Sequence, residues 1–248
     1  GNSFLTRSKL FAFGNSRQTE VFFSRKIGLN QDVVGGARMF GQVGNTSVGA
    51  LNIHTRGNGE APATHYSAIR LRKDVRDRTT VGVILTDVAS KGVRNSVYGI
   101  DGQMRFWGSS SISAWYSRVK DIDYTQNPYA SMVKIDLKND RYFLTAGQHR
   151  VGSDFKPLLG FVQRNDMVGT GALAGFTPRV GQGDKLIRQL RFTVYGRDVR
   201  SFDGVKQTET LSGGIDAILE SRDRIGVKFS QDREFLDYNF TLGNGVEI

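Results

Sequence analysis

The sequence predicts an all-β fold of antiparallel strands that follow one another along the chain. Helical periodicity is nearly absent from the 248 residues, whereas apolar and polar residues alternate over many segments. Glycine is abundant, with 30 residues against 4 prolines, and no collagen-like period accompanies it. Alternation with a period of two is typical of a strand with one dry face and one wet face.

The alternation places apolar side chains on one face and charged side chains on the other. The apolar positions are Ile69, Leu71, Tyr98, Ile100, Met104, Val133, Ile135, Leu137, Ile225, Val227 and Phe229. The opposite face of the same segments carries Arg70, Arg72, Asp101, Arg105, Lys134, Asp136, Arg224 and Lys228.

Breaks at Gly, Asn and Asp clusters divide the chain into strands. We predict strands at 33–43, 46–56, 64–74, 79–88, 96–108, 110–120, 129–138, 141–150, 168–178, 186–200, 206–220 and 223–232. Gly44-Asn45, Asn139-Asp140 and 221–223 are typical of hairpin turns, so neighbouring strands are expected to be antiparallel. Segment 151–167 is an irregular insertion. No composition shift marks a linker, which predicts one domain over 1–248, with a lead-in at 1–30 and strands over 31–248.

The length of the strands favours a membrane barrel over a soluble sandwich or small barrel. Crossing a bilayer at a tilt takes about 9–11 residues, whereas strands of soluble proteins average about 5–6. A wet face rich in Arg, Asp, Gln and Lys suits an aqueous lumen. We therefore expect an antiparallel up-and-down β-barrel of the outer-membrane type. Arg188 shares a face with Leu190 and Phe192, so it must lie near an interface or beside a bulge, or else contradict this interpretation.

The ends of the chain bear on how complete this barrel is. The chain starts GNSF, without Met or a signal peptide, and is expected to be a mature or truncated piece. It ends at NGVEI, without the terminal aromatic residue common in outer-membrane barrels, which leaves open that later strands are missing.

Composition limits the chemistry and the partners. The absence of cysteine excludes thiolate zinc sites, thiol catalysis and disulfides. The formal charge is +10 and the isoelectric point is near 9.9, but the cations are scattered and form no long basic block. The charge therefore suits outer-membrane lipid or lipopolysaccharide, glycans or other envelope proteins better than nucleic acid. No cofactor is expected.

Several motifs resemble one family over nearly the whole chain. FFSRKIG (Phe22–Gly28), GGARMFGQVGNTSVGALNIHT (Gly35–Thr55) and DFKPLLGFVQRND (Asp154–Asp166) occur in its order. RLRKDVRDRTTVGVILTD and NSVYGIDGQMRF lie between them, and NSFLTRSKLFAFG resembles its lead-in. The chain is thus similar to the barrel-like C-terminal domain of unknown function in bacterial envelope proteins that carry a family 9 carbohydrate-binding-like domain. It departs from that pattern at Thr6-Arg7 and at Gln163. The resemblance implies an outer-membrane-barrel-like fold and no known activity.

Six residues are candidates for lumenal binding or for anchoring the lead-in: Arg25, Arg70, Arg72, Asp101, Arg105 and Arg164. Arg25 lies between Phe22-Phe23 and Ile27, where a buried guanidinium requires a carboxylate or carbonyls. We expect it either to anchor the lead-in on an acid such as Asp101 or to contact a ligand. Arg70, Arg72 and Arg105 are expected to line the lumen, where they select anions or simply hydrate the wall and pair with Asp101.

The sequence predicts no enzyme. His54, His65 and His149 have no ligand spacing, and Asp121/Asp123 lie in a turn-like stretch. The glycines of GTGALAG (169–175) lack the ending of a phosphate loop and indicate a strand, and no nucleophile elbow occurs.

Trp107 and Trp115 are expected either to form an interfacial belt or to stack on sugars. The expected function is that of a non-enzymatic outer-membrane barrel of a Gram-negative bacterium, acting in transport, glycan handling or as the anchor of a surface assembly. The alternative is a soluble all-β binding module for acidic glycans or other polyanions, with its apolar faces packed inside.

Overall fold

The chain is all-β, as predicted, with almost no helix. The computed structural model describes residues 10–59, 61–121, 126–180 and 186–235, together with the backbone of 241–242 and 246–247. Within this part, no helix has the length and apolar character needed to cross a membrane.

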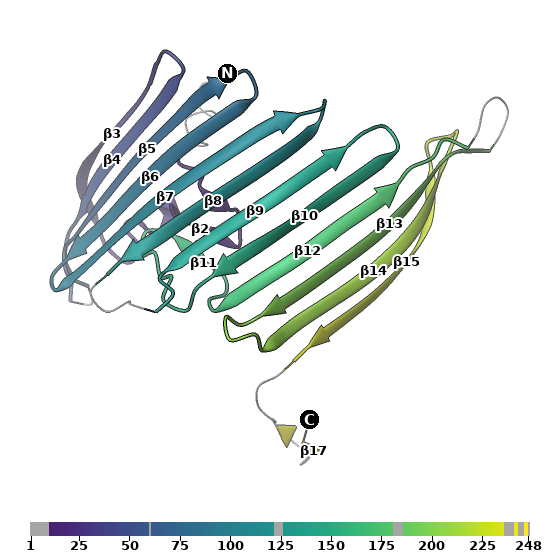
Figure 1. Cartoon of the computed structure of the whole chain (residues 1–248). Helices are drawn as coiled ribbons and strands as arrows, with labels where there is room; N and C mark the ends of the chain where they lie inside the picture. The colour runs from purple at the N-terminus through teal and green to yellow at the C-terminus, as the bar shows by residue number, and fades with distance from the viewer. Residues whose placement is uncertain are drawn as a thin grey trace. The chain divides into compact units, whose positions relative to one another are not determined.

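All twelve predicted strands are present in one antiparallel sheet (Figure 1). They are β3 (Val33–Val43), β4 (Thr46–Thr55), β5 (Thr64–Arg76), β6 (Thr79–Ser90), β7 (Val93–Phe106), β8 (Ser110–Lys120), β9 (Tyr129–Lys138), β10 (Tyr142–Val151), β12 (Met167–Phe176), β13 (Ile187–Arg200), β14 (Lys206–Leu219) and β15 (Arg224–Glu234). Their order in the sheet follows their order in the chain, so each predicted turn joins neighbours. Among the described strands, β3 and β15 are the edges and no pairing joins them, so the closed barrel stays a prediction.

Short elements that the alternation did not predict lie outside this sheet. In the lead-in, β1 (Gly14–Asn15) and β2 (Thr19–Glu20) precede the 3-10 helix η1 (Ser24–Lys26). Within the predicted insertion 151–167, β11 (Phe161–Val162) pairs with β2. β16 (Thr241–Leu242) pairs with β17 (Val246–Glu247) near the C-terminus. Elements of two or three residues are too short to show a period, which is why the sequence did not reveal them.

The chain divides into two compact units, and the single domain over 1–248 stays a prediction. Unit 1 comprises Gly1–Ile135 and His149–Met167. Unit 2 comprises Asp136–Gln148 and Val168–Ile248.

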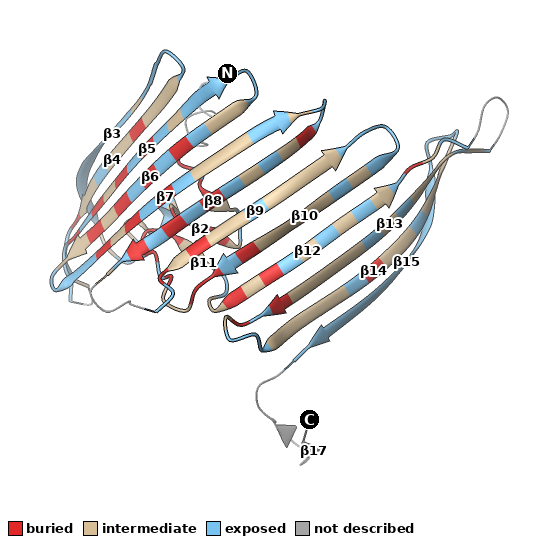
Figure 2. Cartoon of the chain, viewed as in Figure 1, coloured by how far each residue is buried: buried red, intermediate tan, exposed pale blue. Residues whose placement is uncertain are grey.

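In unit 1 the apolar side chains of the strands are exposed. We call the face that carries them the outer face, and the opposite face the inner face. Ile69, Leu71, Ile100 and Met104 are 46%, 38%, 60% and 46% exposed. The strand register adds Met39, Val81, Val83, Leu85, Tyr98, Ile112 and Tyr116 to the outer face. Many inner-face residues of β5 to β8, such as Ala68, Ile84 and Val97, are buried, so buried and exposed positions alternate along much of these strands (Figure 2).

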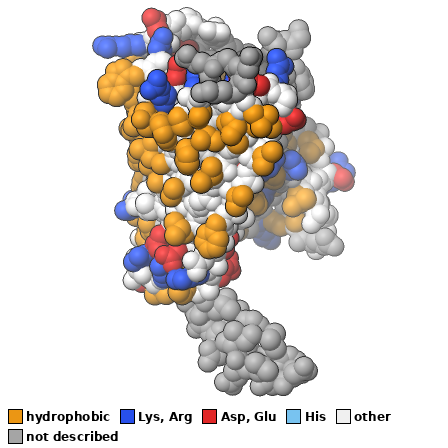
Figure 3. All heavy atoms as spheres, turned by 90° about the vertical axis from the view of Figure 1, so that its right-hand side faces the viewer, with side chains coloured by type: hydrophobic (Ala, Val, Ile, Leu, Met, Phe, Trp, Pro, Cys, Tyr) orange, Lys and Arg blue, Asp and Glu red, His pale blue; other side chains and the backbone are white. Residues whose placement is uncertain are grey.

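Unit 2 has the same arrangement on its own strands. Its outer face carries Phe176, Phe192, Val194, Leu211, Ile215, Ile225, Val227 and Phe229, all of them exposed. Its inner face carries Arg191, Arg197, Asp216, Arg224 and Lys228. Figure 3 views this side of the chain, where hydrophobic side chains gather across the middle and charged side chains lie above and below.

Arg188 lies in a bulge, which is one of the possibilities left open by its shared face with Leu190 and Phe192. The register of β13 against β14 shifts between Ile187 and Gln189, which places Arg188 in a bulge at the beginning of the strand. A bulge leaves one residue out of the ladder and re-aims its side chain. The cation therefore lies at the end of the apolar positions rather than among them.

Candidate functional site

The lead-in packs on the inner face of unit 1 through a hydrophobic cluster. Its buried members are Phe11, Tyr66, Ala68, Val88 and Leu159, with Phe22 and Ile27 packed against them. The rings of Phe11 and Phe22 stack with their centroids 4.8 Å apart. Part of the face that alternation predicted to be wet is therefore a dry core, because a covering segment excludes water from it.

Backbone pairing joins the lead-in to the insertion. β2 pairs with β1 on one side and with β11 on the other. The Gln163 amide donates to the carbonyl of Gln18 (2.8 Å), and the Phe23 amide donates to the carbonyl of Leu159 (2.7 Å). The segment just before FFSRKIG thus forms a small sheet with β11 of the insertion, and FFSRKIG itself is held to the insertion through Phe23.

Arg70 is the charged residue that connects the lead-in to the strands beneath it. Its side chain is fully buried, and its Nη1 and Nη2 donate to the two carboxylate oxygens of Asp101 at 2.6 and 2.8 Å. Its Nε donates to the backbone carbonyl of Leu10 (3.2 Å), and its Cζ lies 5.3 Å from the centroid of the Phe13 ring. Such a forked pair fixes the guanidinium in one orientation. One side chain thereby links β5, β7 and the lead-in.

Two glycines of the wall make this approach possible. A Cβ on Gly82 would lie 2.6 Å from Oδ1 of Asp101 and 2.8 Å from Nη1 of Arg70. A Cβ on Gly99 would lie 2.5 Å from Cζ of Phe13. Glycine in a strand interior often marks a place where another group approaches closely. The guanidinium of Arg70 passes over Gly82 of β6 to reach Asp101, and the Phe13 ring packs directly against Gly99.

Asn95 fastens the insertion to the same wall. Its side chain is buried, and its Nδ2 donates to the carbonyl of Lys156 and to Oδ2 of Asp121, each at 3.1 Å. Its Oδ1 accepts a hydrogen bond from the Leu158 amide (3.0 Å). A single amide side chain on β7 thus holds the backbone of 156–158.

The expectation that Arg25 pairs with Asp101 is wrong, and the alternative that it contacts a ligand stays a prediction. Arg25 lies in η1 and is exposed, with its Cζ 5.2 Å from the centroid of the Phe23 ring. Arg70, and not Arg25, occupies both oxygens of Asp101. The apolar neighbours of Arg25 in sequence suggested burial, but the 3-10 turn directs the guanidinium over the Phe23 ring instead. The alternative in which Arg70 pairs with Asp101 is confirmed.

The other candidates do not gather into one site. Arg72 is half-buried on the inner face, and its Nη2 donates to Oγ1 of Thr80 (3.3 Å). Arg105 is exposed beside the β7–β8 turn, and Arg164 is exposed just after β11. The structure therefore joins Arg70 to Asp101 and leaves Arg72, Arg105 and Arg164 at separate places.

The histidines lie closer together than their sequence positions suggest. His54 and His65 are cross-strand partners on β4 and β5, with stacked rings 4.1 Å apart. The register of the β4–β5 hairpin was the signal that could have found this pair. In the part of the chain that the structure describes, no group of three or more His, Cys, Asp or Glu side chains is placed to hold a metal ion.

The two tryptophans differ, so the interfacial belt expected of both is wrong for Trp115. Trp115 is buried on the inner face, with its ring 5.9 Å from Phe13 and 5.6 Å from His149. Trp107, in the β7–β8 turn, is 82% exposed. Trp115 is an odd-numbered residue of β8, whereas the outer-face residues Ile112 and Tyr116 are even-numbered. The alternation could therefore have placed Trp115 on the inner face.

Two further expectations concern glycines and carboxylates. The GTGALAG segment lies in strand β12, as predicted, and Gly175 accommodates the ring of Phe143. Asp121 accepts from Asn95, whereas Asp123 lies outside the described residues.

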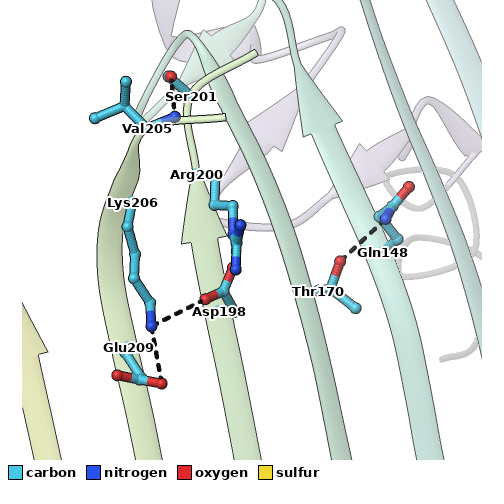
Figure 4. A network of polar contacts seen from close by, with 8 residues as sticks. All are labelled: Gln148, Thr170, Asp198, Arg200, Ser201, Val205, Lys206 and Glu209. Atoms are coloured by element: carbon cyan, nitrogen blue, oxygen red, sulfur yellow. Dashed lines mark hydrogen bonds and ion pairs between the residues drawn. The ribbon is translucent and has the colours of Figure 1, made fainter. Parts of the chain in front are cut away.

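Unit 2 carries a charged network beyond its apolar band (Figure 4). Arg200 Nε donates to Oδ1 of Asp198 (2.6 Å), and Lys206 Nζ lies 3.0 Å from Oε1 of Glu209 and 3.7 Å from Oδ2 of Asp198. Asp198 and Glu209 are register partners on the outer face, two strand positions beyond Gly196 and Leu211. The apolar band of these strands therefore ends in a row of paired charges.

No protein-family model, no curated protein and no solved structure matches the chain. The resemblance to the barrel-like envelope domain accordingly stays a prediction. The geometry shows Arg70 bound to both oxygens of Asp101 and to the carbonyl of Leu10, so this side chain connects the strands to the lead-in.

Proposed function

We propose that this chain is a non-enzymatic outer-membrane β-barrel domain of a Gram-negative cell envelope, whose lead-in and insertion form a plug against the inner wall. The observation that carries the proposal is the exposure of the apolar outer face in both units, whereas much of the inner face of unit 1 is buried beneath the lead-in and the insertion. Contiguous apolar surface of this extent on a monomer marks a surface that meets lipid or another protein. A bilayer covers such a face on every strand at once.

Strand geometry supports the same function. The twelve strands of the sheet have 10 to 14 residues each, and bacterial single-chain barrels have even strand numbers and spans of about 9–11 residues. Closure of the sheet by pairing of its two edge strands belongs to this proposal. The domain would act in transport, glycan handling or as the anchor of a surface assembly, with outer-membrane lipid or lipopolysaccharide, glycans and other envelope proteins as its partners.

A soluble binding module for polyanions is the second candidate, and the formal charge of +10 favours it. It requires the apolar outer face to be covered by protein. Ile69, Leu71, Ile100 and Met104 are exposed instead, so this function would need a partner chain over the whole band.

The test is expression of the chain behind an outer-membrane signal sequence, followed by fractionation and electrophoresis with and without heating. An outer-membrane barrel is expected in the outer-membrane fraction, with faster migration before heating than after it. Recovery as a folded protein in detergent-free buffer, with unchanged migration on heating, would contradict the proposal and favour the soluble module.

A further inference from the structure

The β7–β8 turn holds a tryptophan in a backbone conformation that suits it poorly. Trp107 has a φ of +40° and the following Gly108 a φ of +70°. A bulky residue in the left-handed region is an outlier, whereas glycine and asparagine adopt it readily. Trp107 is 82% exposed and its ring packs edge-on against that of Phe106 (5.1 Å between centroids), so little burial offsets this conformation. Strained residues of this kind are found where a side chain serves a contact with another molecule.

The surroundings of Trp107 are cationic. The Arg105 amide donates to the carbonyl of Arg78 (2.9 Å), which brings the β7–β8 turn beside the β5–β6 turn. Four cations lie on these two hairpins and are exposed: Lys73, Arg76, Arg78 and Arg105. Within the described chain, none of the four forms an ion pair with a carboxylate, although Asp74 and Asp77 are near in sequence. We call Trp107 and these four cations the turn cluster.

The turn cluster adjoins the apolar outer face. Met104, three residues before Trp107, and Val75, one residue before Arg76, are both exposed apolar side chains. Along β7 the outer face thus runs from Ile100 through Met104 to the turn. An indole beside an apolar band, among cations that form no ion pair within the described residues, matches the layer where acyl chains give way to headgroups.

We propose that the turn cluster docks into the headgroup layer of a bilayer and binds its anionic headgroups. The inference rests on the proposed membrane function and adds to it the rim that meets the charged lipid. The indole ring lies at the level of the headgroups with its apolar body toward the acyl chains. The four cations pair with lipid phosphates, since an anionic surface attracts each basic side chain within a Debye length.

The test uses the fact that the chain has only two tryptophans. The full chain is reconstituted in vesicles of phosphatidylcholine and phosphatidylglycerol that carry bromine, a fluorescence quencher, at shallow or deep acyl positions. Trp115→Phe leaves Trp107 as the fluorophore, and Trp107→Phe leaves the buried Trp115 as the matched control. We expect shallow bromine to quench Trp107 more than deep bromine does, and neither to quench Trp115. The fluorescence of wild type minus that of Trp107→Phe also reports the quenching of Trp107, with Trp115 left in place.

A second variant tests the anionic specificity. With Arg76, Arg78 and Arg105 all changed to Gln, quenching of Trp107 in vesicles with phosphatidylglycerol is expected to fall to its level in neutral vesicles. Equal quenching in both vesicle types for wild type and variant would overturn the assignment of anionic headgroups.

A third variant separates this inference from the proposed function. Ile100→Trp, introduced with Trp107→Phe and Trp115→Phe, reports on the middle of the outer face. Deep quenching of Trp at position 100 together with no quenching of Trp107 would overturn the inference and leave the membrane function standing. Absence of quenching at both positions would overturn both.

Discussion

At the scale of single residues, Arg70 is the fully buried charged side chain in the described part of unit 1. A fully buried guanidinium is stable only when paired and hydrogen-bonded. Asp101 supplies both oxygens and Leu10 a carbonyl, so the pairing also determines where the lead-in lies. The carboxylate retains 27% exposure, which lets it hydrate when its partner is removed.

Removal of the Arg70 side-chain charge is expected to destabilise unit 1. Arg70→Met leaves Asp101 without its partner at a cost of about 3 kcal/mol, since breaking a buried pair costs about 3–5 kcal/mol and the partial exposure of Asp101 favours the lower end. Arg70→Lys should cost nearly as much, because an ammonium cannot reproduce the fork. Arg25→Ala is the matched control and should change stability by less than about 0.5 kcal/mol.

The measurement is denaturant unfolding of the detergent-folded chain, with proteinase K cleavage within 10–31 as a local readout. Cleavage of the lead-in should accelerate in both Arg70 variants and not in Arg25→Ala. Equal stability of Arg70→Met and Arg25→Ala would show that the Arg70–Asp101 pair does not hold the lead-in.

Trp107 allows a prediction of the opposite sign. Trp107→Asn places at φ +40° a residue that tolerates the left-handed region, which should stabilise the folded chain by about 1 kcal/mol in detergent. Trp107→Phe keeps a bulky side chain there and serves as the control, with little change expected. Denaturant midpoints of the two variants in the same micelles check this, and a loss of stability in Trp107→Asn would contradict it.

At the scale of elements, the strands could be predicted because their signal is local. Period-two alternation and turn residues lie within each hairpin, and the twelve predicted segments match the strands to within a few residues. The lead-in could not be predicted in the same way. Its strands β1 and β2 have two residues each, and β2 pairs with β11 across about half the chain.

The Arg70–Asp101 pair could have been predicted from the register of the strands. β5, β6 and β7 are joined by two-residue turns, so their register follows from the alternation once the turns are placed. That register sets Gly82 between Arg72 and Asp101 on the inner face, with Arg70 two positions away on the same face. A glycine between a cation and an anion leaves a path for a long side chain. The apolar residues beside Arg25 in the sequence suggested a buried cation there, but they do not indicate which cation pairs with Asp101.

Asn95 tests how the insertion is held. Asn95→Ala removes three hydrogen bonds at a buried site and leaves the Leu158 amide without its acceptor, for which we expect a cost of about 1–3 kcal/mol. Amide hydrogen exchange should rise in 155–159 and remain unchanged in β5. Asn52→Ala, at an exposed outer-face residue that donates to Ser67, is the matched control. Equal exchange in the two variants would show that Asn95 does not fasten the insertion.

At the scale of the whole molecule, each unit presents an apolar outer face; the inner face of unit 1 is partly a hydrophobic core, and that of unit 2 carries charged side chains. Alternation alone shows that a strand has two kinds of face and does not say which one meets protein. In unit 1 the lead-in and the insertion cover much of the inner face, whereas no segment that the structure describes covers the apolar outer face. The sequence could not settle this, because the covering segment carries no periodic signal of its own.

A charge on the outer face should be costly in a membrane and harmless in water, and its cost should depend on depth. In a bilayer, Ile100→Arg is expected to destabilise the folded chain by about 2–4 kcal/mol, because arginine at the midplane of a barrel costs about that much. Met104→Arg, on the same strand and face but beside the turn, should cost about 0–1 kcal/mol. The two side chains are 60% and 46% exposed, so a soluble protein would tolerate either change. Unfolding free energies in vesicles measure the difference, with detergent micelles as a second medium. Equal and small effects of the two substitutions would mean that no bilayer covers the outer face, and that a partner or water does.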